Sequence, residues 1–338
     1  MLIFLAVSLQ SCSEEVELFP ENKQDQLVVW AYLDGNGAVH RAKVRKGITW
    51  IVDETGNDDR SGGGYLDPDS VEIWLSGEDV IRLDYKPMPY PAYENEQNGA
   101  ALNLIHELEG FNPHSGSSYQ LNIRNLANGE ITTAVISAGP FAGFSYPSRV
   151  TENTLFDFTL SYHPFKITWY AAPITSWSIR IKYLDILKSG DTIYRAPVFH
   201  SAWSYYNNTR EFPLDYLWSL FNKIIPTDNK VDFRMFYRFD FVVWSGDHHL
   251  RNYLKVAQGY TDNRKQYFSN VENGLGLFYF TDSEMIRNVR PKDAFGSRLS
   301  ESDSVKHLKF VRHLYEGKFP DSLFSMQNPL IPLNLQQP

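Results

Sequence analysis

Alternation of apolar and polar residues dominates this chain and predicts a mainly β protein. An unbroken apolar run from Leu27 to Leu33 predicts a strand buried on both faces, because one exposed face would bring in polar residues at every second position. The following Asp34-Gly35-Asn36-Gly37 is strong turn chemistry and predicts a hairpin into the alternating residues 38–45. Further apolar positions of the same kind lie at 71–75, 81–85, 119–123 and 131–135, the last two runs flanking Asn128-Gly129. This spacing predicts an immunoglobulin-like β-sandwich over residues 26–140.

The second half repeats the pattern with more aromatic residues. Residues 137–148 are rich in small residues and proline, which predicts a boundary between domains. Beyond it, alternating apolar positions run through 156–162, 177–183 and 231–243, predicting a second β-sandwich-like domain over residues 146–296. Helices are expected after Pro213, after Asp247 as N-cap, and around Val305 to Leu314, the last within a C-terminal helix and tail over residues 297–338.

Composition supports this fold class and narrows the partners. The chain has 20 Tyr, 22 Phe and 8 Trp, residues that favour strands and contact surfaces. Its formal net charge is −8, and no basic stripe is visible, so a nucleic-acid partner is not expected.

The only cysteine, Cys12, follows a short apolar run over residues 2–7. The run is too short to span a bilayer and is typical of a signal peptide over residues 1–11, although no Lys or Arg precedes it. Leu9-Gln10-Ser11-Cys12 resembles the lipobox of bacterial lipoproteins, which predicts acylation of Cys12 and a tether over residues 12–25. The alternative is a buried N-terminal strand with an incidental cysteine.

An acidic pair stands directly after the cysteine, in Ser13-Glu14-Glu15. It resembles the signal that sends Bacteroidota lipoproteins to the outer face of the outer membrane. A solvated charged tether would need only the same polarity.

A longer stretch, residues 268–278, resembles the C-terminal signature of a Bacteroidota lipoprotein family, domain-of-unknown-function family 4249. The matching positions are Asn270, Asn273, Gly274, Gly276 and Phe278. The resemblance implies an outer-membrane lipoprotein whose gene neighbours a TonB-dependent transporter, and it implies no biochemical activity. Physically, the glycines indicate a bulge or a close backbone approach within a strand, since no helix or lysine follows to complete a phosphate loop.

Few residues suggest catalysis or metal binding. His248-His249 lacks a histidine four residues further on, so solvated residues at a helix start are expected there and no metal site. The acidic, glycine-rich residues 57–69 offer oxygen ligands for calcium, but a solvated loop is the favoured interpretation. No nucleophile elbow occurs, although a paired-carboxylate glycan hydrolase stays an alternative. No enzyme activity and no cofactor are expected.

Two aromatic segments are the candidate contact surfaces. One contains Tyr90 and Tyr93 in a proline-rich stretch, and the other contains Trp203, Tyr205 and Tyr206. Aromatic rings suit sugar faces or protein partners, whereas burial in the core is the alternative. Four Asp-Ser/Thr-apolar tripeptides, at residues 69, 191, 303 and 321, resemble the Bacteroidota O-glycosylation motif.

Together these features predict a surface-exposed, lipid-anchored accessory or ligand-binding subunit beside a TonB-dependent β-barrel. A stand-alone glycan- or peptide-binding module and an accessory of outer-membrane protein assembly are the alternatives.

Overall fold

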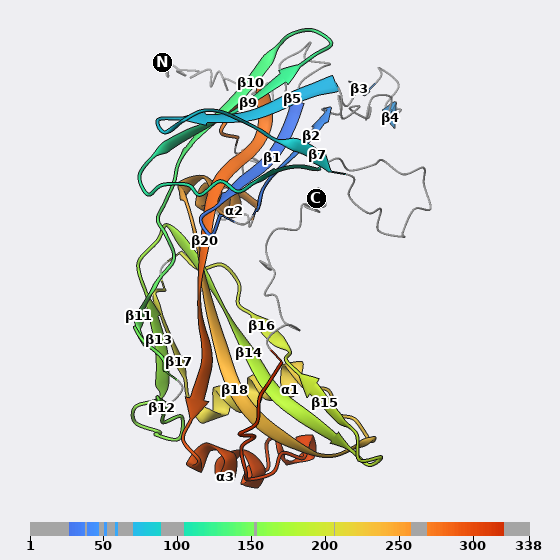
Figure 1. Ribbon diagram of the computed structural model, residues 1–338, viewed down its shortest axis with the longest axis vertical. Helices are drawn as coiled ribbons and strands as arrows, with labels where there is room; N and C mark the ends of the chain where they lie inside the picture. Colours follow the sequence, from blue (N-terminus) through green and yellow to red (C-terminus); the bar gives the residue numbers. More distant parts are fainter. Residues whose placement is uncertain are drawn as a thin grey trace, which may run out of the picture.

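A computed structural model describes residues 27–37, 39–46, 51–52, 58–59, 70–88, 105–151, 154–205, 207–257 and 269–320. The chain is mainly β, as the sequence predicts, and it forms two lobes joined along one axis (Figure 1). The immunoglobulin-like connectivity and the domain boundaries stay predictions.

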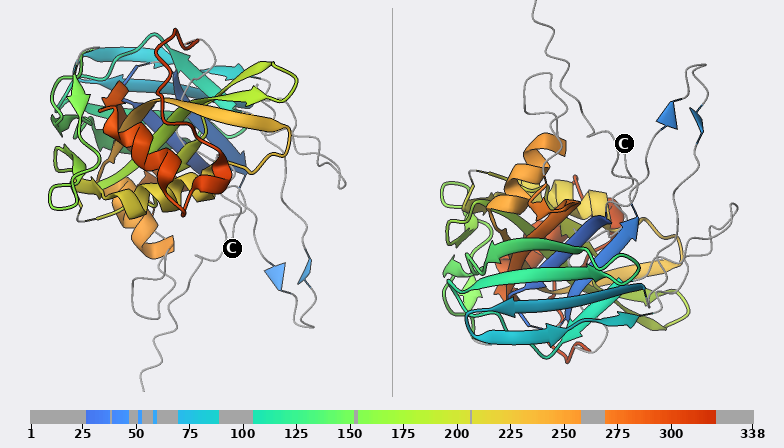
Figure 2. Two further views of the ribbon diagram at one scale, coloured as in Figure 1. Left: turned by 90° about the horizontal axis from the view of Figure 1, so that it is seen from below. Right: turned by 90° about the horizontal axis from the view of Figure 1, so that it is seen from above.

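The upper lobe is a pair of facing sheets seen from above in Figure 2. One sheet has the order β19-β10-β9-β5-β6, and the other contributes β20-β1-β2-β8-β7. Their strands are β1 (Leu27–Asp34), β2 (Val39–Lys46), β5 (Val71–Gly77), β6 (Val80–Asp84), β7 (Lys86–Met88), β8 (Ile105–Glu109), β9 (Ser118–Asn125), β10 (Ile131–Ser137), β19 (Val271–Glu272) and β20 (Gly274–Pro291). A separate pair, β3 (Ile51–Val52) and β4 (Asp58–Asp59), completes the described elements of this region.

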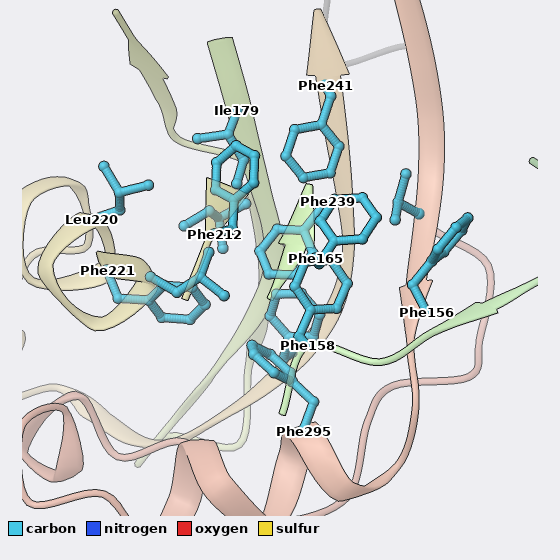
Figure 3. Close-up of a cluster of buried hydrophobic side chains, with 14 of the residues drawn as sticks. Phe156, Phe158, Phe165, Ile179, Phe212, Leu220, Phe221, Phe239, Phe241 and Phe295 are labelled. Atoms are coloured by element: carbon cyan, nitrogen blue, oxygen red, sulfur yellow. The ribbon is translucent and has the colours of Figure 1, made fainter. Parts of the chain in front are cut away.

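The lower lobe is a long twisted sheet closed on one face by a smaller sheet and helices. Its strands and helices are β11 (Phe144–Tyr146), β12 (Leu155–Phe156), β13 (Phe165–Trp169), β14 (Ile174–Leu187), β15 (Thr192–Arg195), β16 (Val198–His200), β17 (Thr209–Phe212), α1 (Leu214–Ile224), β18 (Val231–Gly246), α3 (Ala294–Glu301) and the 3-10 helix η2 (Lys306–Leu308). Helix α2 (His248–Ala257) lies higher, where the two lobes meet (Figure 1). Interlocked aromatic rings fill the closed face, including Phe158, Phe165, Phe239 and Phe295 (Figure 3).

Strand β20 belongs to both lobes. Residues 274–281 pair in parallel with β1, and residues 281–289 pair antiparallel with β18. Leu27, at the start of the described chain, therefore lies beside Gly274. Residues near the C-terminus complete the core of the upper lobe, where Phe278 and Phe280 are fully buried.

Most predicted elements are confirmed. Leu27–Asp34 is a central strand covered on both faces, Gly35-Asn36 turns into β2, and α1 and α2 begin where Pro213 and Asp247 predict. The predicted N-cap of α2 is confirmed by the Asp247 carboxylate, whose Oδ1 accepts a hydrogen bond from Leu250 N at 2.9 Å.

The third predicted helix is wrong. The chain forms α3 earlier, over Ala294–Glu301, and only a single 3-10 turn near Leu308. Val305, Leu308 and Leu314 are buried, but irregular backbone holds them there, and Lys309 with a φ of 60° ends the turn. Their helix-like spacing thus reflects contact with the core and not helical hydrogen bonding.

Several strand faces also differ from the prediction. In β10 the buried positions are Thr132, Ala134 and Ile136, so Ile131 and Val135 face outward. Strand β12 ends at Phe156, and the predicted continuation leaves Leu160 and Tyr162 exposed. Ile81, an apolar position of the predicted strand over residues 81–85, is 98% exposed. A hairpin needs only one covered face, and the partner packed against it decides which face that is.

The longest alternating run, residues 231–243, is one strand but does not keep one face buried. A register shift against β14 places Phe236 opposite Tyr183 and Arg238 opposite Lys182, which leaves Tyr237 as an extra residue. A β-bulge of this kind moves side chains to the other face. Just before the bulge, Phe236 packs in the aromatic core, whereas the extra residue Tyr237 is half-buried.

Candidate functional site

The face of the lower sheet opposite its aromatic core is strongly charged. Cross-strand pairing places five cations there: Arg180 and Lys182 from β14, Arg238 from β18, and Arg287 and Arg290 from β20. Asp240, on β18, is the carboxylate that these three strands contribute to the same face. We call these six residues the cationic face. It contrasts with the net charge of −8 of the whole chain.

We call Arg180, Lys182, Asp240 and Arg287 the upper half of the cationic face, and Arg238 and Arg290 its lower half. Asp240 is at the centre of the upper half. Its Oδ2 lies 2.9 Å from Lys182 Nζ and 3.4 Å from Arg180 Nη1, and its Oδ1 accepts Asn288 N–H at 2.8 Å. Lys182 Nζ also donates to Asn288 Oδ1 at 2.9 Å. Arg180, Lys182 and Asp240 are nearly fully buried. Burial lowers the pKa of Arg180, which the attraction of Asp240 partly offsets and the repulsion of Arg287 reinforces.

A bulge in β20 produces this arrangement. Phe241 pairs with Ile286 and Phe239 with Val289, so two residues, Arg287 and Asn288, face the single residue Asp240. Asn288 has a φ of 58°, in the left-handed region that Asn tolerates better than most residues. The bulge therefore adds the Asn288 N–H to this carboxylate and brings Arg287 near Arg180.

The lower half of the cationic face carries the last described segment of the chain. Figure 1 shows this dark red segment leaving α3 and running up across the sheet. Glu316 from the segment lies between Arg238 and Arg290, at 3.4 and 2.9 Å. The Phe319 ring stacks on Tyr237, with centroids 5.1 Å apart and planes inclined by 9°.

Above the cationic face, where the lobes meet, lies an aromatic cluster under helix α2. Trp203 is buried in this cluster with Trp244 and Tyr279. Tyr205 is half-buried at its margin, with Lys255 Nζ 5.7 Å from its ring. Of the predicted contact residues, Trp203 thus packs inside the protein and Tyr205 lies at its edge. Tyr90, Tyr93 and Tyr206 lie outside the described residues.

A serine–histidine pair lies between the cationic face and the aromatic cluster. Ser178 Oγ and His200 Nδ1 are 2.6 Å apart, and the His200 ring is 6.0 Å from Trp244. Burial lowers the pKa of His200, which favours its neutral form. Ser178 itself is completely buried, so its hydroxyl orients the imidazole and is not positioned to attack a substrate from solvent.

Two buried carboxylates hold the crossing between the lobes. Asp247 Oδ2 accepts Phe280 N–H at 2.9 Å, and Asp282 Oδ2 accepts Ala142 N–H at 2.7 Å. Burial raises the pKa of Asp247 to about 6, although its backbone N–H partners act in the opposite direction. The pKa of Asp282 is raised to about 6 by burial, with smaller contributions from Asp34 and Glu284. Both groups bind backbone, which gives them a structural role.

The histidines after Asp247 follow the sequence interpretation in part. His248 is exposed and His249 is half-buried at the start of α2. Within the described ranges, no three His, Cys, Asp or Glu side chains are grouped to hold a metal ion. The acidic loop proposed for calcium lies outside the described residues, apart from Asp58 and Asp59 in β4.

The residues of the 268–278 stretch organise the start of β20. The Asn270 amide bonds both backbone groups of Phe278, at 2.6 and 2.9 Å. Asn273, with a φ of 55°, donates to Ile131 O in β10 at 3.3 Å. Gly276 has a φ of 121°, and a Cβ there would overlap the Val29 carbonyl. These contacts lock the parallel pairing of β20 with β1.

Sequence reasoning missed the cationic face, although a signal for it was present. Arg180 and Lys182 alternate with apolar residues in one predicted strand, as Arg238 and Asp240 do in another. The alternation alone predicts a solvated charged face. Pairing of β14 with β18 concentrates the four residues, and the bulge in β20 adds Arg287.

No family model matches this sequence, and a search of curated proteins finds no similar chain. Among the helices of the described residues, none is long and apolar enough to cross a lipid bilayer. The candidate lipidation and export residues, Cys12, Ser13, Glu14 and Glu15, lie outside the described part of the chain.

Proposed function

We propose that this protein is a non-enzymatic, lipid-anchored binding subunit of a Bacteroidota-type outer membrane, exposed at the cell surface and working beside a TonB-dependent transporter. In this proposal the cationic face, with Arg287 exposed and Arg290 partly exposed, is the surface that binds ligand or partner.

The cationic face is the observation that carries the binding role. Five cations against the carboxylates of Asp240 and Glu316 give this region of an acidic protein a local positive charge, which reaches the surface at Arg287 and Arg290. Burying cations that have no counter-charge is costly, because the charges lose their hydration. A cluster of cations next to buried groups is therefore expected to bind an anionic group. Such a surface favours anionic groups and steers them during association.

The membrane location rests on the sequence. Leu9-Gln10-Ser11-Cys12 resembles a lipobox, and Ser13-Glu14-Glu15 resembles a surface-export signal. Two or three acyl chains on Cys12 would give stable anchoring, which a single chain does not. The resemblance of residues 268–278 to family 4249 supports the transporter partnership.

Purification of the native complex tests this proposal. The full-length protein with a C-terminal tag is expressed in a Bacteroidota host, the outer membrane is solubilised in mild detergent, and co-purifying proteins are identified. Recovery of a TonB-dependent β-barrel is expected. A Cys12→Ser variant, checked by labelling with a palmitate analogue, should lose the label and the membrane fraction. Labelled protein recovered without any barrel would refute the partnership, and unlabelled wild-type protein would refute the anchor.

A further inference from the structure

Two side chains at the end of the last described segment contact the lower cationic face. Glu316 contacts Arg238 and Arg290, and Phe319 stacks on Tyr237 with Lys182 Nζ 5.9 Å from its ring. Tyr194 closes the other side of Phe319, with centroids 5.1 Å apart and an edge-on geometry. The face thus has a slot for a carboxylate and, three residues later, a slot for an aromatic ring.

In the part of the chain that the structure describes, the backbone hydrogen bonds from this segment to the sheet end at Tyr315. Val311 N donates to Arg234 O at 2.9 Å, and Tyr315 N donates to Phe236 O at 2.7 Å. Among the described residues, no backbone hydrogen bond joins residues 316–320 to the sheet. Glu316 is 52% exposed, and Gly317 and Lys318 are exposed as well. The Glu316 ion pairs are weak, since exposed ion pairs are screened by solvent and salt. The packing of Phe319, which is 7% exposed, is therefore the stronger anchor of this segment.

Counted over the described residues, the five cations of the cationic face outnumber its two carboxylates, Asp240 and Glu316. Asp240 lies between Arg180 and Lys182, and Glu316 lies between Arg238 and Arg290, so each carboxylate meets two cations. Arg287 adds a further, exposed cation next to the first group. An extended chain with more carboxylates than residues 315–320 would match this face better.

We propose that the cationic face is a docking site for an extended acidic segment of a partner protein, and that Glu316 to Phe319 occupy it in cis until the partner displaces them. The partner segment carries a carboxylate three residues before an aromatic ring. This inference rests on the proposed function and names the chemistry by which the subunit recognises its partner.

Binding of a short peptide to the full-length protein tests the proposal. The probe is a fluorescein-labelled peptide that copies residues 313–320, and its anisotropy is measured at low salt. Glu316→Gln combined with Phe319→Ala frees the slots, so this variant should bind the probe at least about tenfold more tightly than the unmodified protein. Adding Arg238→Gln and Arg290→Gln should remove the gain. Lys318→Gln, at an exposed position of the same segment, is the matched control and should leave binding unchanged.

Two further measurements keep the result decisive. Thermal unfolding followed by circular dichroism checks that each variant is folded, and the single Glu316→Gln variant replaces the double one if Phe319→Ala unfolds the lobe. Hydrogen exchange on the unmodified protein should show faster exchange of the Tyr315 amide, which donates to Phe236 O, when unlabelled probe is added in excess.

Equal affinity of the folded variant and the unmodified protein would overturn the inference, as would tight binding that persists without Arg238 and Arg290. Its failure is separable from failure of the proposed function. A barrel that co-purifies equally with the Arg238→Gln/Arg290→Gln variant would leave the transporter partnership intact and remove only this docking site.

Discussion

Replacement of Asp282 by Asn should make the crossing between the lobes more stable at neutral pH. The carboxyl is 5% exposed, accepts Ala142 N–H and lies near Asp34 and Glu284, which oppose its ionisation. Asn keeps a side-chain oxygen for the Ala142 N–H and carries no charge. The substitution therefore separates the cost of the buried charge from the value of the hydrogen bond.

The sign and size of this effect follow from the pKa. The pKa of Asp282 is raised from 3.8 to about 6 in the folded protein. A raised pKa means that the stabilising contribution is complete below pH 4 and is lost as the pH rises through 6. The difference of about two pKa units corresponds to roughly 3 kcal/mol in the free energy of unfolding. Asp247, with a pKa of about 6, should add a loss of the same sign.

Urea unfolding followed by tryptophan fluorescence, at pH values from 4 to 7.5, measures the effect. Wild type and Asp282→Asn should be equally stable near pH 4, and the variant should become more stable by up to roughly 3 kcal/mol at pH 7. Glu78→Gln, in an exposed turn, is the control and should run parallel to wild type. A stability difference that does not change with pH would refute the assigned ionisation of Asp282.

Three other substitutions test the packing around the site. Gly276→Ala should abolish folding or cost several kcal/mol in thermal unfolding, because a Cβ would meet the Val29 carbonyl, whereas Gly190→Ala, also at positive φ but in open space, should cost only about 1–2 kcal/mol. Arg234→Met should destabilise by about 3–5 kcal/mol, since it removes one of the two cations paired with buried Asp185, which keeps Arg195, and the donor to the carbonyls of Leu308 and Pro226. Adding Asp185→Leu should restore part of that loss in urea unfolding. Trp203→Ala should cost about 3–5 kcal/mol in the same assay because the indole is buried, while an equal loss for half-buried Tyr205→Ala would contradict the placement of these two rings.

The strands and turns could be predicted because their causes are local. Period-two alternation in residues 177–183 and turn residues such as Gly35-Asn36 and Asn128-Gly129 act within a few positions of the chain. Proline and aspartate marked the starts of α1 and α2 for the same reason. Residues 9–12, which resemble a lipobox, lie outside the described residues, and the lipid anchor stays a prediction.

Burial and pairing depend on partners far away in the chain. The sequence does not show that β1 pairs in parallel with β20, or that Ala134 and not Val135 faces the core. The strand pairing and the choice of buried face both depend on which hydrophobic surfaces come together. A strand with an alternating pattern can pair in more than one way until the sheets pack.

The candidate site also depends on contacts between distant parts of the chain. Alternation alone determined that Arg180, Lys182, Arg238 and Asp240 share strand faces with other polar residues. Only the tertiary structure decided that these faces join, that a bulge turns Arg287 and Asn288 onto Asp240, and that the chain returns with Glu316 and Phe319. The physical reason is range: strand formation is a property of neighbouring residues, whereas register, bulges and charge clusters are set by contacts between distant segments of the chain.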